Sequence, residues 1–532
     1  EIVMKKSKII IISILVFIMT AALTGCKNSV TTGDEVDDDS AKSFIYWCEL
    51  PSTIASKVQT LEDTPFYQEL EKKTGIKITF VHPPLGQAAE QFKLMVASNN
   101  MYDLVEYYWF NYPGGPAKAI EDGTILKLND YIDRYAPNLK KVISESELAE
   151  VYRKGSMTDN GDFFAFPSLN TGDCRTFGGL IIRKDWLDEL GLEVPETIDE
   201  WTLVLRAFKE KKGAEAPLTG LAPYFLVGGN AFNSAYNIGK GLYLDGDMVK
   251  FGVLQPEFRA YVQQMRDWYK EGLLDRGFIT VDKKIVASNM TTGKSGACIA
   301  FIGKEMGSYL EQMKNDPTYD LVAAPYPVKN KGEKSRFVAM EGDVTSTYLA
   351  ISSSCKDPIT ATKWIDFWYS QEGYMFLNFG IEGVSYNMVD GKPVYTDLIL
   401  NNPDGLTISE ALGMYTRASA PAPGINQAPE YLEQFYPYPQ QKEAMKLWAE
   451  CTAEARKTEL PKSLMYSLEE NEECTALETD INTYCEEMVL KFIIGEEPME
   501  RFDDFIQQFK TKFNVERYVA VKQAAYDRYR NR

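Results

Sequence analysis

Histidine is almost absent from this chain of 532 residues, in which His82 is the only one. One imidazole excludes metal sites built from two or three histidines, including the H-E-x-x-H pattern. We expect His82 itself to be a loop residue, because Pro83-Pro84 follows it directly. Gly293-Lys294-Ser295 lacks the earlier glycine of a phosphate-binding loop, and no G-x-S-x-G occurs. We therefore predict no catalytic residue, no metal site and no cofactor.

Cysteine is also scarce, and the eight cysteines are dispersed without any C-x-x-C pair. This distribution fits neither a disulfide framework nor a zinc site. Apart from Cys26, we expect them to be small buried side chains. They are Cys48, Cys174, Cys298, Cys355, Cys451, Cys474 and Cys485.

Basic residues are outnumbered, with 57 Lys and Arg against 76 Asp and Glu, for a net charge of -19. Such an acidic surface argues against nucleic acid as a partner. Long apolar runs are missing too: the stretch from Ile9 to about Met19 is shorter than the roughly 20 residues of a membrane-spanning helix. A globular chain of this length is expected to form two or three domains or lobes.

Cys26 ends the run Leu23-Thr24-Gly25-Cys26, which follows three lysines and that short apolar stretch. The pattern resembles a bacterial lipobox. The resemblance implies that residues 1–25 are a lipoprotein signal peptide and that acyl chains on Cys26 hold the protein at the extracytoplasmic face of the cell membrane. Residues 26–42 are polar and rich in Asp, Ser and Thr, which predicts a flexible tether.

Strand and helix patterns alternate after the tether. We expect strands at 44–47, 76–81 and 103–107, with helices at 64–74 and 88–97 between them. This order predicts an α/β fold with a mostly parallel sheet and helices on both faces. Ligands of such sheets bind outside the carboxyl ends of the strands.

Several later segments resemble family 1 extracellular solute-binding proteins, the binding components of sugar-importing ABC transporters. They are residues 160–167 (NGDFFAFP), 182–192, 195–201, 290–303, 348–352 and 380–386. The resemblance implies a two-lobed, periplasmic-binding-protein-like fold of type II, each lobe a mostly parallel sheet flanked by helices, with a helical C-terminal extension on the second lobe. We place one lobe at 43–167 plus 327–380 and the other at 168–326 plus 381–532, with crossings near Pro167, 324–327 and Gly380.

Sugars have apolar ring faces and hydroxyl-rich edges, so their sites combine flat aromatic rings with amides, carboxylates and arginine. Aromatic residues past strand ends, Trp109 first among them, are therefore our candidate ligand contacts, although one of Tyr107 and Tyr108 should face the core. The candidates are Trp47, Glu49, Tyr107, Tyr108, Trp109, Asn111, Asn170, Arg175, Tyr224, Asn230, Phe232, Glu382 and Tyr386. Tryptophans in helical patterns are expected in the core: Trp186, Trp201, Trp268, Trp364, Trp368 and Trp448.

These features favour a monomeric, non-enzymatic receptor that captures an oligosaccharide between its lobes and delivers it to a membrane permease. The aromatic and acidic residues of the expected cleft favour a sugar over anionic solutes. Two alternatives stay open: a binding protein of the same fold for peptides or another polar solute, and a surface enzyme that cleaves polysaccharide with a carboxylate pair.

Overall fold

The first sheet is built from strands that lie far apart in the sequence, from β1 near residue 43 to β14 near residue 424. The computed structural model describes residues 42–170, 175–226, 231–239, 241–418, 420 and 422–532. The predictions for Cys26, the signal peptide and the tether lie outside these residues, as do Cys174 and Asn230. The six-stranded sheet has the order β14-β4-β11-β3-β1-β2. Its strands are β1 (Ser43–Trp47), β2 (Lys77–Val81), β3 (Leu104–Tyr107), β4 (Phe166–Asn170), β11 (Val344–Ile351) and β14 (Gly424–Asn426).

Local signals place the helices of this first lobe. The hydroxyl of Thr64 caps α1 (Pro65–Thr74), and Gly75 ends it with a left-handed φ of 66°. The carboxylate of Asp357 caps α13 (Pro358–Asp366), as the Asp-Pro pair predicts. The other helices of this lobe are α2 (Ala88–Ala97), α3 (Gly115–Glu121), α4 (Asn129–Tyr135), α5 (Pro137–Glu145), α6 (Ala149–Gly155) and α14 (Gln371–Phe379).

Alternation along the strands divides the core of this lobe into two layers. Leu104 lies in a cluster with Tyr46 on one face of the sheet. Val105, its neighbour in β3, lies in a second cluster with Trp47 and Trp109 on the other face. Side chains that alternate between the two faces of a strand produce this arrangement. Both faces of the sheet are therefore buried, as expected for an α/β layer.

The second sheet has four strands in the order β10-β5-β9-β6. They are β5 (Gly178–Arg183), β6 (Leu218–Thr219), β9 (Ala297–Phe301) and β10 (Leu321–Ala324). Helices surround them: α7 (Lys184–Leu190), α8 (Ile198–Lys212), α9 (Ala222–Phe225), α10 (Glu257–Glu271), α11 (Lys283–Thr291) and α12 (Gly307–Gln312). Thr197 and Glu200 form the predicted capping box at the start of α8. The six helical tryptophans are at most 6% exposed, so their assignment to the core is confirmed.

Strand directions differ from the mostly parallel sheets that we expected. In the second sheet, β5 is antiparallel to both β9 and β10. In the first sheet, β11 is antiparallel to both β3 and β4. The reason is topological: β5 and β11 enter their lobes from the hinge, whereas β4 and β10 leave their lobes toward it. In each sheet, one strand that begins at the hinge therefore lies between two strands that end there, and it is antiparallel to both.

The third passage between the lobes lies after β14 and not near Gly380, where we expected it. Residues 424–426 pair with β4 and so belong to the first sheet, which corrects the assignment of 381–532 to the second lobe. The segment before β14 also contacts the first lobe, because Glu410 pairs with Lys57 at 3.3 Å. This segment contains β12 (Tyr386–Val389), β13 (Lys392–Tyr395), α15 (Asp397–Leu400) and α16 (Ile408–Tyr415).

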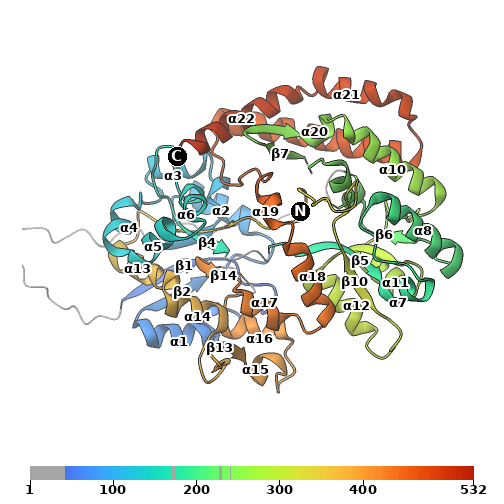
Figure 1. Cartoon of the computed structure of the whole chain (residues 1–532). Helices are drawn as coiled ribbons and strands as arrows, with labels where there is room; N and C mark the ends of the chain where they lie inside the picture. Colours follow the sequence, from blue (N-terminus) through green and yellow to red (C-terminus); the bar gives the residue numbers. More distant parts are fainter. Residues whose placement is uncertain (1–41, 171–174, 227–230, 240, 419, 421) are drawn as a thin grey trace, which may run out of the picture. The chain divides into compact units, whose positions relative to one another are not determined.

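The C-terminal part is helical, as predicted, and packs mainly on the second lobe (Figure 1). Its helices are α17 (Pro429–Phe435), α18 (Pro439–Ala449), α19 (Thr452–Arg456), α20 (Leu468–Ile494), α21 (Phe502–Thr511) and α22 (Val515–Arg530). Helix α20 packs along α10, and α22 packs on α20 and on the hairpin of β7 (Leu242–Asp245) and β8 (Met248–Phe251).

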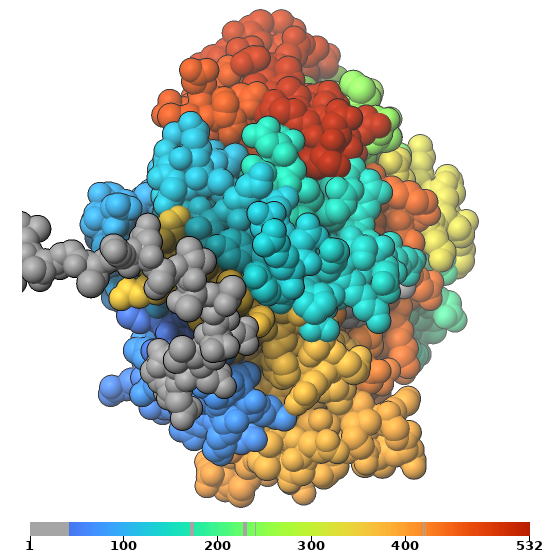
Figure 2. Space-filling view, turned by 90° about the vertical axis from the view of Figure 1, so that its left-hand side faces the viewer, coloured from blue at the N-terminus to red at the C-terminus, as the bar shows by residue number. Residues whose placement is uncertain are grey.

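At the end of α22 the chain returns to the first lobe. Arg528 and Arg532 both bind the carboxylate of Asp159, at 3.2 and 2.7 Å. Figure 2 shows the red C-terminal helices directly above the cyan segment that contains α6. The two lobes are thus joined by the chain passages and by this ion-pair cluster.

Candidate functional site

A cavity of about 800 Å³ lies between the two lobes. Ser52 and Thr53 reach it just after β1, Phe301 at the end of β9, and Gln427 just after β14. Residues that precede the strands entering each lobe complete the wall, namely Phe177 before β5 and residues 338–341 before β11. The cavity therefore lies at the hinge-facing strand ends, where ligands of α/β sheets bind. Its volume is within the usual range for ligand pockets.

Aromatic rings form one side of this cleft. Phe301 is 39% exposed, although it ends a buried strand. The π-helical turn η5 (Ile302–Met306) follows it, and Glu305 of this turn accepts a hydrogen bond from the Phe301 amide at 3.1 Å. A Cβ on Gly303 would lie 3.2 and 3.3 Å from the rings of Phe435 and Tyr436, so the backbone approaches these rings closely. Phe177 and Phe435 are half-buried and Tyr436 is buried, so the ring of Phe301 offers the main flat apolar platform.

Polar side chains form another part of the cleft wall, which also includes Val338, Ala339, Met340 and Leu432. Ser52, Thr53 and Ser409 contribute hydroxyls and Gln427 contributes an amide. Glu341 is the carboxylate among the lining residues, which also include three lysines. Hydroxyls and amides both donate and accept hydrogen bonds, so this wall suits a ligand with many hydroxyl groups.

Two predicted ligand contacts lie instead in the core of the first lobe. Trp109 is fully buried, and its indole donates a hydrogen bond to the carbonyl of Val105 at 3.2 Å. Trp47 is 3% exposed and packs edge-on against Tyr107, with ring centroids 5.8 Å apart. Neither tryptophan has surface to offer a ligand in this conformation. Both pack in the second layer of the core, where a large apolar side chain is most stable.

The neighbours of Trp109 lie between core and cleft. Tyr107 and Tyr108 are both half-buried, so alternation does not separate them as expected, and Asn111 is exposed. The Tyr108 hydroxyl donates to the carbonyl of Lys462 at 2.8 Å, and Lys462 lines the cleft. Burial raises the pKa of Tyr108 to about 12, so its hydroxyl keeps its proton. Glu49 is exposed after β1 but is not among the lining residues.

Asn170 and Arg175 belong to the hinge and do not line the cleft. Arg175 is 1% exposed, forms an ion pair with Asp343, and donates to the carbonyl of Asn170 at 2.7 Å. The Asn170 amide donates to the carbonyl of Gly342 at 3.1 Å. These contacts join the passage after β4 to the passage before β11. The two residues therefore stabilise the hinge in this conformation.

The remaining predicted residues are dispersed. Phe232 is buried in the core of the second lobe, edge-on to Trp268 with ring centroids 4.9 Å apart. Tyr224 is half-buried in α9. Glu382 is exposed and Tyr386 is buried near the β12–β13 hairpin. None of these four residues lines the cleft.

Phe177, Phe301, Tyr431, Phe435 and Tyr436 are the cleft aromatics that sequence reasoning missed. Phe301 could have been predicted from the sequence, because it lies at the end of the strand expected in residues 290–303, and we chose other candidates for lying past strand ends. The others had none, since Phe435 and Tyr436 reach the cleft only through the passage after β14.

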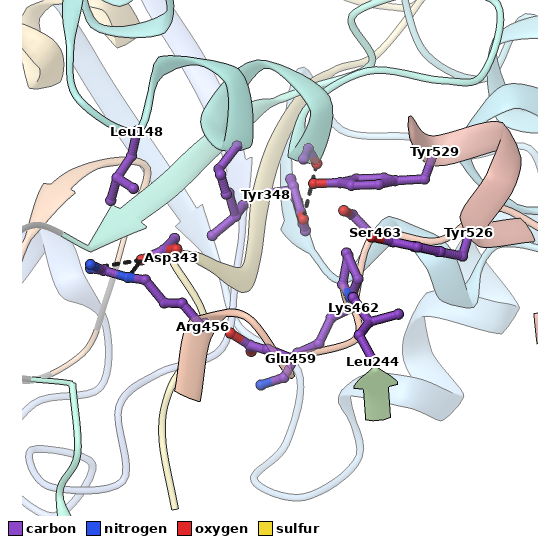
Figure 3. Close-up of a pocket in the computed structure, with 15 residues that line it drawn as sticks. Leu148, Leu244, Asp343, Tyr348, Arg456, Glu459, Lys462, Ser463, Tyr526 and Tyr529 are labelled. Carbon is purple, nitrogen blue, oxygen red and sulfur yellow. Dashed lines mark hydrogen bonds and ion pairs between the residues drawn. The ribbon is translucent and has the colours of Figure 1, made fainter. Parts of the chain in front are cut away.

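A second cavity, of about 250 Å³, lies beside the hinge (Figure 3). Arg456 reaches Asp343 at 3.3 Å, and Tyr526 and Tyr529 of α22 contribute to the opposite wall. Glu459 also lines this cavity. Burial, together with the like charge of Asp343, raises the pKa of Glu459 to about 7.

This carboxyl should make stability depend on pH. Because its pKa rises from 4.5 to about 7 on folding, the neutral form stabilises the fold below pH 4.5, and that contribution is lost as pH rises through 7. We expect Glu459→Gln to be more stable than the parent by about 1–3 kcal/mol at pH 7.5 and by little at pH 4.5. Urea unfolding at several pH values measures the difference. Glu443→Gln, an exposed change on α18, is the control, and a pH-independent difference would contradict the assignment.

Among the described residues, no His, Cys, Asp and Glu side chains group in a way that could hold a metal ion. The six cysteines in that part of the chain are free, and five of them are buried. No helix in the same part combines the length and apolarity needed to cross a bilayer.

Two α/β lobes that enclose a cleft at their hinge define a binding protein of the two-lobed, type II class. The chain belongs to the bacterial extracellular solute-binding protein family, whose model matches residues 59–375. The resemblance stated from the sequence is thus confirmed.

Individual relatives agree with this assignment. The chain is 24% identical to Lipoprotein LipO of Bacillus subtilis over 422 residues, which are 74% of this chain and 76% of LipO. It is 24% identical to the fructooligosaccharide ABC transporter substrate-binding protein FusA of Streptococcus pneumoniae over 502 residues, 87% and 86% of the two chains. A solved HMO-binding solute-binding protein of Bifidobacterium longum infantis matches with a TM-score of 0.71 at 18% identity, covering 92% of this chain and 99% of that one.

Proposed function

We propose that this protein is the solute-binding component of an ABC importer and captures an oligosaccharide in the cleft between its lobes. The observation that carries the proposal is the cleft of about 800 Å³, with aromatic rings on one side and hydroxyl and amide groups on the other. Rings stack on the apolar faces of sugars, while polar groups bind their hydroxyls. The relative FusA, named for fructooligosaccharide, supports the sugar class.

Hinge movement couples capture to delivery. A ligand that contacts both lobes favours the closed arrangement, and the closed surface is what a permease can distinguish from the empty protein. In this proposal the protein acts as a monomer and delivers its ligand without converting it, as a receptor and not as an enzyme. The resemblance of residues 23–26 to a lipobox supports anchoring through Cys26 at the extracytoplasmic face of the membrane, and the relative LipO is named a lipoprotein. Partition of the cellular protein into a detergent phase tests the anchor.

Calorimetric titration of the purified protein with a panel of oligosaccharides tests the function. We expect one-to-one binding with the sugar recovered intact. Recovered fragments would identify a polysaccharide-cleaving enzyme. Binding to peptides but to no sugar would contradict the carbohydrate assignment.

The ring of Phe301 is expected to contribute strongly to affinity. Phe301→Ala should weaken oligosaccharide binding by about 10- to 100-fold, because covering a phenylalanine ring stabilises a complex by about 1.5–3 kcal/mol. Stability should fall by only about 1–2 kcal/mol, since the ring is 39% exposed. The same titration measures the effect.

Leu203→Ala is the matched control, because Leu203 is 63% exposed on α8 and does not line the cleft. Its affinity should equal that of the parent. Equal affinity of the Phe301 and Leu203 variants would show that the ligand does not bind on the β9 side of the cleft.

A further inference from the structure

The charge of the cleft is opposite in sign to that of the whole chain. The sequence has a net charge of -19. The cleft wall, in contrast, contains three lysines and one carboxylate: Lys283, Lys304, Lys462 and Glu341. This finding reverses our expectation of an acidic cleft. Walls of low dielectric focus the field of such charges into the cavity.

Two of these lysines are available to a ligand. Lys283 forms an ion pair with Glu305 at 3.0 Å. Lys304 and Lys462 are exposed, and within the part of the chain that the structure describes neither has a carboxylate oxygen within 4 Å. They come from different elements: Lys304 from the turn after β9, and Lys462 from the segment between α19 and α20. Both lysines thus line the cleft, and Lys462 also lines the cavity beside the hinge (Figure 3).

Their positions are set by the fold. Lys304 lies in the π-helical turn η5, whose start is held by the bond from the Phe301 amide to Glu305. The carbonyl of Lys462 accepts the hydrogen bond from Tyr108, which ties its backbone to the first lobe. Lys304 and Lys462 therefore stand on backbone that is fixed at the cleft wall, and Lys304 follows the exposed ring of Phe301 by three residues.

Glu341 is exposed and sets one carboxylate against the three lysines. Partial desolvation by the surrounding protein raises the pKa of that carboxyl. Nearby Lys462 and Arg175 act in the opposite direction but do not cancel the rise. The cleft as a whole is thus positively charged and lined with rings and hydroxyls.

We infer that the ligand is an anionic oligosaccharide, whose ring-borne carboxylate or sulfate groups bind Lys304 and Lys462 while its apolar faces stack on the cleft aromatics. This inference rests on the proposed function. Charge-assisted hydrogen bonds are about twice as strong as neutral ones, so a sugar with an anionic substituent gains affinity that a neutral analogue lacks. The acidic exterior of the protein disfavours anions elsewhere, which confines their binding to the cleft.

Matched pairs of probes test the inference by calorimetry on the full-length protein in detergent. Trigalacturonate is compared with its methyl ester, and a sulfated neocarratetraose with its desulfated form. We expect the anionic member of a pair to bind at least tenfold more tightly in 50 mM NaCl. That advantage should shrink in 500 mM NaCl, because salt screens partly exposed charges.

Single-lysine variants test which side chains are responsible for the preference for the anionic probe. Lys304→Met and Lys462→Met should each reduce the affinity for the anionic probe by about threefold to tenfold and leave the affinity for its neutral partner within twofold. Lys93→Met removes the same charge from an exposed position on α2 and should change neither affinity.

Each outcome is decisive. Preference for the sulfated probe alone supports the inference and assigns the anion to sulfate, whereas preference for trigalacturonate alone assigns it to carboxylate. Equal or tighter binding of the neutral members overturns the inference and leaves the proposed function in place. Binding to no oligosaccharide, charged or neutral, overturns both.

Discussion

Replacing Trp109 by alanine is expected to lower the free energy of unfolding by about 3–5 kcal/mol, the usual cost of removing a buried tryptophan. The indole is fully buried, packs edge-on against Phe92 with ring centroids 5.3 Å apart, and bonds to the carbonyl of Val105. Its loss leaves a cavity in the core layer between β3 and α2 and one carbonyl without its donor. Urea unfolding measures the change.

Phe301→Ala is the control for this experiment, because that ring is 39% exposed and its removal should cost about 1–2 kcal/mol, well below the cost of removing the buried indole. The two substitutions therefore separate stability from binding: the Trp109 variant should bind normally while folded, and the Phe301 variant should fold normally and bind weakly. A stable Trp109 variant with lost affinity would show that this side chain leaves the core to meet the ligand, as the sequence first suggested.

Glu106→Ala is expected to be similarly destabilising, by about 3–5 kcal/mol, because it leaves a buried guanidinium without its carboxylate. Arg417 is 3% exposed and donates to Glu106 at 3.3 Å and to the hydroxyl of Tyr67 at 2.5 Å. Tyr46 donates to the same carboxylate. This network attaches the segment after α16 to β3, and its loss should be measured by thermal unfolding.

The double variant Glu106→Leu with Arg417→Met is the matched control. Removing both charges and replacing them with apolar groups of similar size leaves no uncompensated ion, so much of the lost stability should return. If the double variant were as unstable as Glu106→Ala, the unpaired charge would not be the source of the lost stability. The loss of the hydrogen bonds to Tyr46 and Tyr67 would then explain it.

Local elements of the fold were predictable because their signals are local. The apolar periods of α1 and α2, the glycine after α1 and the capping box of α8 all depend on residues within one or two turns. The strand ends at Trp47 and Tyr107 were also predictable. Strand directions were less so, since the positions of β5 and β11 depend on where the chain crosses between lobes.

The candidate site shows the limit of such reasoning. A sequence pattern places an aromatic residue near a strand end, but it does not say whether the ring points to the core or to the cleft. Trp109 and Phe301 both lie at strand ends, and only the first is covered, by the packing of α2 and its neighbours. Phe435 reaches the cleft through a passage that follows β14, far along the chain from the other walls.

The sequence by itself determined the family, the α/β class, the helical tryptophan core and the absence of enzyme motifs, because these follow from composition, local periodicity and spaced motifs. The tertiary structure alone decided which residues form the cleft and what charge it has. Residues 52, 177, 301, 341, 427 and 462 meet there only when both lobes are folded. Burial and electrostatic focusing depend on such long-range contacts, which no local window of sequence contains.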